Sequence, residues 1–198
     1  MINKHIPVNP YNRPNLKSTC EEIAIHYSGD KGASAARLAQ YYQNVAAGVF
    51  KDTPKAWTSA NYIVGYDGEI ICCIPSGGVS YAVSGHNNRL INIEVCYTDD
   101  NGKFTAAAIK SLAALVQRLM RTYNIPADKV KRHFDYTGKY CPYYYVVNAD
   151  KWEELHKTIT GAPPPKTYTL TARNLSALQR DLIDDTLERL GVTDYTFD

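Results

Sequence analysis

The chain has 198 residues, of which 44% are hydrophobic and 21% charged, and its formal net charge is +2. This composition is typical of a globular protein and excludes a chain that is disordered for most of its length. The length is sufficient for one domain with a normal core. The small net charge does not indicate a nucleic-acid partner, and no apolar run is long enough for a membrane span. We therefore expect neither nucleic-acid binding nor membrane insertion.

The first quarter of the chain predicts a strand followed by a helix. Residues 1–20, rich in Asn and Pro, are expected to form an extended lead-in. Residues 21–27 (EEIAIHY) have the pattern of a short apolar strand. Residues 34–49 carry apolar side chains at three- and four-residue steps, which predicts a helix, and Ser34 is a suitable N-cap.

The middle of the chain predicts three further strands. Residues 61–75 (NYIVGYDGEIICCIP) contain two β-rich runs around an Asp-Gly pair, a strong signal for a hairpin because Gly accepts the positive φ of a tight turn. Residues 91–97 (INIEVCY) alternate aliphatic side chains with others. Glu94 therefore lies on the strand face opposite the aliphatic set.

Two helices and a loop-rich stretch are predicted next. Residues 105–123 carry the clearest apolar stripe of the chain, residues 130–144 are expected to be rich in loops, and residues 149–158 form a short helix. The order of these elements predicts an α/β domain, with a mixed central β-sheet flanked by helices.

The C-terminal part of the chain is expected to be separate from this domain. Residues 161–166 (GAPPPK) predict a stiff linker between a domain at 1–160 and a tail at 167–198. The tail has an amphipathic helical pattern but is too short to bury a core alone. We expect it to pack on the main domain, to pair with a second copy in a homo-oligomer, or to bind a partner.

Two histidines and one cysteine are candidate metal ligands. His26 ends the first apolar strand, and His133 precedes Cys141 by eight positions, with Gly and turn residues between them. Two imidazoles and one thiolate suit Zn²⁺, and three protein ligands leave a fourth position open, as catalytic zinc requires. Each residue taken singly is equally well explained as a packing or surface side chain.

The remaining cysteines allow a different interpretation. An odd total of five, irregularly spaced, argues against a disulfide framework. One of the other four could complete a structural zinc site, or several could serve a redox function. Three of them lie in predicted strands, where a cysteine behaves as a small buried hydrophobe. The four are Cys20, Cys72, Cys73 and Cys96, the last three in strands.

Four segments within residues 20–160 resemble the zinc-dependent N-acetylmuramoyl-L-alanine amidases of the type 2 amidase family, which share their fold with peptidoglycan-recognition proteins. The segments are IAIHYS, NYIVGYDGEI, AVSGHNNRLINIEVCY and, most specific of all, VKRHFDYTGKYCP. The resemblance implies this fold and hydrolysis of the amide bond between N-acetylmuramic acid and L-alanine in bacterial peptidoglycan. The alternative is a non-catalytic peptidoglycan-recognition module, in which the third metal ligand is typically replaced.

The resemblance also implies roles for individual residues. His26, His133 and Cys141 match the family's three zinc ligands. Lys139 matches a catalytic lysine near the scissile carbonyl. Glu94 matches the catalytic glutamate of one branch of the family and would serve as the general base.

Two more residues are expected to contact substrate. Another branch of the family has a catalytic tyrosine whose best match here is Ala60, a departure that leaves Tyr62 only in reserve. His86 lies in the Gly- and Ser-rich loop before the strand of Glu94, where a substrate contact and an ordinary loop role are both credible.

The N-terminal residues contain no apolar stretch that could act as a secretory signal. We therefore expect synthesis in the cytoplasm and action on the cell wall after release. That is the behaviour of a phage endolysin, with a bacterial autolysin or an injected effector as alternatives. The tail at 167–198 could then also contribute to wall binding.

Overall fold

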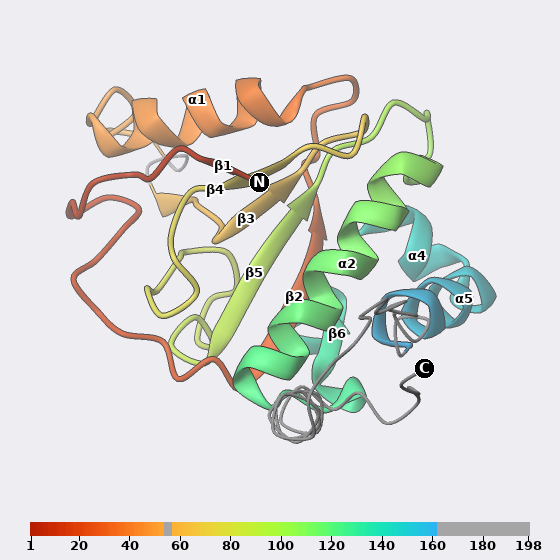
Figure 1. The fold of residues 1–198 in the computed structure, drawn as a ribbon. Coiled ribbons are helices and arrows are strands. Elements are labelled where there is room, and N and C mark those ends of the chain that lie inside the picture. Colours follow the sequence, from red (N-terminus) through yellow and green to blue (C-terminus); the bar gives the residue numbers. More distant parts are fainter. Residues whose placement is uncertain (54–56, 162–198) are drawn as a thin grey trace, which may run out of the picture. The chain divides into compact units, whose positions relative to one another are not determined.

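A six-stranded sheet lies at the centre of residues 1–53 and 57–161, the part of the chain that the computed structural model describes (Figure 1). The order of strands is β1-β4-β3-β5-β2-β6; β3 and β4 are antiparallel and the other neighbours are parallel. The strands are β1 (Ile2–Asn3), β2 (Glu22–Tyr27), β3 (Tyr62–Val64), β4 (Ile70–Cys72), β5 (Leu90–Val95) and β6 (Val130–Arg132).

Helices cover both faces of the sheet, as predicted. Helix α1 packs on one face, and α2 and α5 pack on the other (Figure 1). The helices are α1 (Ala35–Ala46), α2 (Ala106–Tyr123), α3 (Phe134–Thr137), α4 (Tyr143–Val147) and α5 (Ala149–Thr160), with a 3₁₀ turn at Ala127–Lys129. None of these helices is both long and apolar enough to cross a membrane.

The alternation of side chains along β5 divides the interior into two environments. Ile91 and Ile93 belong to the apolar cluster under α2. Asn92 and Glu94 point to the other face, where α1 lies; Asn92 is fully buried and Glu94 lines a cavity there. The face predicted for Glu94 is confirmed, and it is the face on which polar side chains gather.

Local sequence signals explain where several elements begin and turn. The Ser34 hydroxyl accepts a hydrogen bond from the Arg37 backbone N–H at 3.2 Å and caps α1. The predicted hairpin is formed by β3 and β4, and Gly68 in its turn has a φ of +90°, which favours glycine.

Two stretches differ from the prediction. Residues 1–20 contain β1, which pairs with β4, and residues 130–144 contain β6, α3 and the start of α4. These elements have two to five residues each, too few for a periodic pattern to appear. Residues 162–198, which hold most of the predicted linker and the entire predicted appendage, lie outside the described part of the chain.

Candidate active site

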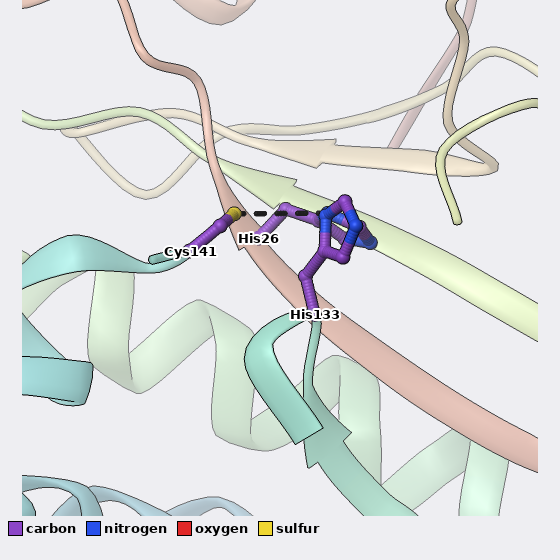
Figure 2. Close-up of side chains that lie close together, drawn as sticks. All are labelled: His26, His133 and Cys141. Carbon is purple, nitrogen blue, oxygen red and sulfur yellow. Dashed lines mark hydrogen bonds between the residues drawn. The ribbon is translucent and has the colours of Figure 1, made fainter. Parts of the chain in front are cut away.

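Three side chains from distant parts of the sequence converge on the α1 side of the sheet. His26 is on β2, His133 directly follows β6, and Cys141 precedes α4 (Figure 2). All three are buried, with 2%, 6% and 3% of their surface exposed. Their potential ligand atoms lie within 4.8 Å of one another.

The backbone holds His133 and Cys141 in place. The His133 N–H donates to the carbonyl oxygen of Ile25 at 3.1 Å, which continues the β2–β6 pairing to the site. The N–H of Phe134 donates to the Cys141 carbonyl oxygen at 3.0 Å and closes the intervening loop. Gly138 reverses the chain between them with a φ of +73°. The predicted approach of the two side chains across this loop is observed.

The two distances from His26 to the other ligand atoms are close to those around a tetrahedral zinc ion. The Nδ1 atoms of His26 and His133 are 3.1 Å apart, and the Sγ atom of Cys141 is 3.8 Å from Nδ1 of His26. Tetrahedral zinc with ordinary bond lengths places nitrogen ligands about 3.3 Å apart, and nitrogen and sulfur ligands about 3.6 Å apart. The donor set and the two distances from His26 therefore fit zinc.

A buried series of hydrogen bonds, from Asn61 through Ser80 and Asn92, determines which ring nitrogen of His26 faces the other two ligands. The Asn61 amide nitrogen donates to carbonyl oxygens of residues 74–78 at 2.9–3.4 Å, so its Oδ1 must accept, and it does so from Ser80 Oγ at 2.8 Å. Ser80 Oγ in turn accepts from the Asn92 amide nitrogen at 2.9 Å. The Asn92 Oδ1 atom therefore accepts a hydrogen bond from His26 Nε2 at 3.0 Å.

This arrangement leaves the lone pair of His26 on Nδ1, the atom that faces His133 and Cys141. Oriented histidine ligands of this kind are typical of metal sites, where a neighbour on the second ring nitrogen fixes the tautomer. Sequence reasoning missed Asn92, although its alternation with Ile91 and Ile93 places it on the same strand face as Glu94.

The environment favours neutral imidazoles. Burial, together with the nearby His133 ring, lowers the pKa of His26 to about 3, and burial lowers the pKa of His133 to about 4. Both rings are therefore neutral near pH 7, the form that binds a metal. Burial raises the pKa of the Cys141 thiol to about 12, and a bound cation would reverse this effect by stabilising the thiolate.

A cavity of about 640 Å³ opens over the three ligands and also contains Glu94 and Lys139. Glu94 pairs in register with His26 across β2 and β5. Its Oε2 atom is buried and has no hydrogen-bond partner among the described residues. Burial raises the pKa of Glu94 to about 8, although the nearby Lys139 ammonium acts in the opposite direction.

The two residues predicted to contact substrate lie away from this cavity. Tyr62 is buried in the apolar cluster on the α2 side, and its hydroxyl is hydrogen-bonded to Ser76 Oγ at 2.7 Å. The His86 ring packs at a tilt against Tyr136, with ring centroids 5.4 Å apart, and accepts a hydrogen bond from Arg89 at 3.0 Å. Neither residue lines the cavity.

The remaining cysteines do not complete a four-ligand site. Among the described residues, the metal-ligand group contains Cys141 and no other cysteine. All five cysteines are free and buried. Two of the others pack in the apolar cluster on the α2 side and two in the cluster on the α1 side; these are Cys20 and Cys72, and Cys73 and Cys96, respectively.

The sequence is similar to those of known amidases. A family model described as N-acetylmuramoyl-L-alanine amidase matches residues 17–144. A probable N-acetylmuramoyl-L-alanine amidase of Bacillus licheniformis is 29% identical over 189 residues, and N-acetylmuramoyl-L-alanine amidase BlyA of Bacillus subtilis strain 168 is 27% identical over 211 residues. These alignments cover 89% and 91% of this chain but 51% and 54% of the relatives. The chain thus spans about half the length of the curated relatives it matches.

Solved structures show the same relationship. A mutant endolysin from Bacillus subtilis is 31% identical with a TM-score of 0.66, and the match covers 80% of this chain and 97% of that one. A complex of peptidoglycan recognition proteins is 16% identical with a TM-score of 0.55, a likeness of fold alone, over 72% of this chain and 90% of that one. Since the family model matches more than half of its residues, the chain belongs to the N-acetylmuramoyl-L-alanine amidase family.

Proposed function

We propose that this chain hydrolyses the amide bond between N-acetylmuramic acid and L-alanine in bacterial peptidoglycan, with zinc as its cofactor. The observation that carries the proposal is the juxtaposition of His26, His133 and Cys141 with the unpaired carboxylate of Glu94 in one cavity. A three-ligand metal group beside a general base is the arrangement that metal-assisted amide hydrolysis requires.

His26, His133 and Cys141 would hold the zinc ion. When bound by three protein ligands, zinc supplies a water of pKa about 7 and polarises the substrate carbonyl. The neutral imidazoles need not lose a proton before binding, whereas the Cys141 thiol must release one.

Glu94 would move the proton during the reaction. In the metal-free protein burial raises the pKa of Glu94 to about 8, and a bound cation would favour the ionised form. The carboxylate could then accept a proton from the attacking water and transfer it to the leaving amine of L-alanine. Without this transfer the departing group would be an unstable amide anion. The unpaired Oε2 atom leaves the carboxylate available for the proton.

Lys139 would stabilise the negative charge that develops on the scissile carbonyl oxygen. Its side chain is exposed at the same cavity, so the ammonium can approach a bound substrate without leaving a buried partner. Removing such a donor typically lowers the rate on the order of 100–1,000-fold.

The proposal is tested by digesting purified peptidoglycan with zinc-loaded protein and identifying the products by mass spectrometry. We expect free stem peptides that begin with L-alanine, and glycan strands that keep their lactyl groups. His133→Ala should release none, whereas His156→Ala, on α5, should leave the digest unchanged. Wall binding without these products would favour the recognition module, and cleavage within the peptide or the glycan would contradict the proposal.

A further inference from the structure

A second cavity lies next to the one over the metal ligands. It has a volume of about 390 Å³ and is lined by Trp57, Thr58, Tyr81, Ala82, Ser84 and Asn87. Thr58 and Ala82 also line the larger cavity, so the two spaces share a wall. The two cavities are therefore adjacent, and one long ligand could contact both.

Trp57 presents a large aromatic surface at this second cavity. Its side chain is 57% exposed, and its ring centroid lies 6.4 Å from that of Tyr11 and 6.3 Å from that of Tyr81. The indole is thus supported by two other rings while much of its surface remains open to solvent. Tyr and Trp, which combine an apolar ring with a hydrogen-bonding tip, are enriched at binding interfaces, and here three such rings form one cluster.

The polar groups of the second cavity are neutral and partly fixed in orientation. Asn87 Oδ1 accepts hydrogen bonds from the backbone N–H groups of Ala82 at 3.1 Å and Val83 at 2.8 Å. The side-chain amide is therefore fixed, with its NH₂ group left as a donor. The hydroxyl groups of Thr58 and Ser84 add further hydrogen-bonding capacity.

Charge distinguishes the two adjacent cavities. Within residues 1–53 and 57–161, none of the side chains that line the second cavity carries a charge, whereas Asp30, Arg37 and Lys139 line the larger one. The substrate has a matching asymmetry. The lactyl carboxyl of the sugar is consumed in the amide bond, which leaves the glycan neutral there, while the stem peptide carries ionised carboxylates.

We infer that the cavity of Trp57 and Tyr81 binds the neutral glycan of the substrate, with an N-acetylated sugar ring next to the peptide-bearing one against the indole face. The stem peptide would then occupy the charged side of the larger cavity, toward Arg37. This assignment rests on the proposed function, because it takes the glycan–peptide junction as the substrate.

Binding is tested without catalysis, on metal-depleted protein. The chain has two tryptophans, so Trp152→Phe leaves Trp57 as the sole indole. Trp152 lies under the Arg132 guanidinium, 5.1 Å away, and does not line either cavity. Titration with neutral oligomers of N-acetylglucosamine should give a saturable change in Trp57 fluorescence. A peptide of L-Ala, D-Glu and L-Lys should give none; a response to the peptide alone, or to neither ligand, would overturn the inference.

Kinetics separate this inference from the proposed function. Trp57→Ala should raise KM for a stem peptide on a tetrasaccharide about 2- to 13-fold more than KM for the same peptide on a single sugar, since an aromatic contact contributes about 0.5–1.5 kcal/mol. Tyr123→Ala, an exposed aromatic at the end of α2, should change neither KM. Equal KM changes for both substrates would refute the sugar site. Failure of the proposed function would instead appear as no hydrolysis of either substrate by the unmodified protein.

Discussion

The Nε2 atom of His26 lies 3.0 Å from the Oδ1 atom of Asn92, and this hydrogen bond leaves the His26 Nδ1 lone pair directed toward His133 and Cys141. Asn92 is itself held by Ser80, so the orientation of the imidazole depends on buried groups that do not belong to the metal-ligand group. The sheet and the loop at residues 74–80 therefore hold the His26 ring in the orientation that metal binding needs.

Asn92→Ala should weaken zinc binding about 10- to 100-fold, the usual effect of removing a partner of a ligating histidine. Without the acceptor on Nε2, the ring can adopt the other tautomer and rotate away from its partners. Competition with a chromophoric chelator measures the affinity. Asn88→Ala, an exposed residue of the same type just before β5, should have no effect. Equal affinities of the Asn92 variant and the unmodified protein would show that His26 is oriented by packing alone.

Cys141→Ala should abolish most of the stabilisation that zinc provides. Free zinc at 100 times its Kd stabilises a folded protein by about 2.7 kcal/mol, and each kcal/mol raises the Tm of a chain of this size by about 2–4 °C. We expect the unmodified protein to show this rise in Tm in thermal melts with and without a chelator, and the variant to show little of it.

Cys73→Ala is the matched control, because Cys73 is fully buried in the apolar cluster on the α1 side but is not in the metal-ligand group. It should lower the Tm by loss of packing and still respond to zinc. If Cys141→Ala responds as strongly as Cys73→Ala does, the metal is bound elsewhere.

The elements that could be predicted from the sequence are those whose signals lie within a few neighbouring residues. The capping hydroxyl of Ser34, the turn at Gly68 and the apolar stripe of α2 each act within a few residues, and each of these elements is found. Strands β1 and β6 were missed because they are two and three residues long and are held by pairing with β4 and β2.

The candidate site also shows that local spacing can be interpreted from sequence, whereas contacts between distant residues cannot. Spacing suggested that His133 and Cys141 could meet across one loop, whereas His26 was grouped with them on ligand chemistry and then through the family resemblance, with no local spacing to relate it to them. The bond between His26 and Asn92 joins residues 66 positions apart, and only the register of β2 against β5 brings them together. Tyr62 was kept in reserve as a substrate contact because the family resemblance places a tyrosine near Ala60, and strand alternation directs it to the opposite face.

Glu94→Gln should raise stability while it removes activity. The folded state keeps the Glu94 proton up to a pKa of about 8, whereas an unfolded chain releases it near 4.5. The contribution of Glu94 to the free energy of unfolding therefore has its full value below about pH 4.5 and is lost as the pH rises toward 8. In metal-depleted protein, the Tm advantage of Glu94→Gln should grow from pH 5 to pH 8 and reach a few degrees.

The same variant should retain zinc, shown by elemental analysis, and lose about 100- to 10,000-fold in kcat, the range for a general base. Glu21→Gln, an exposed neighbour of β2, should change neither property. A near-normal rate in Glu94→Gln would remove Glu94 from the mechanism, whatever its effect on the Tm.

The two histidines should make the metal-depleted protein sensitive to acid, and the Glu94→Gln background isolates this effect from the opposite one of Glu94. Burial lowers the pKa values of His26 and His133 to about 3 and 4 in the folded protein, against 6.5 for an ordinary histidine. An unfolded chain therefore takes up these protons first, so the stability present above pH 6.5 is lost as the pH falls toward 4.

Chemical denaturation of the metal-depleted Glu94→Gln protein at pH 7, 6 and 5 measures this loss as a falling free energy of unfolding. Adding His133→Gln should flatten the pH dependence, because one of the two buried imidazoles is then absent. Adding His156→Gln should leave it unchanged, since this histidine lies on α5 and bonds the carbonyl oxygen of Ala127, away from the cavity. A free energy of unfolding that stays level from pH 7 to pH 5 would mean that the paired imidazoles can be protonated in the folded protein, and that their burial does not keep them ready for a metal.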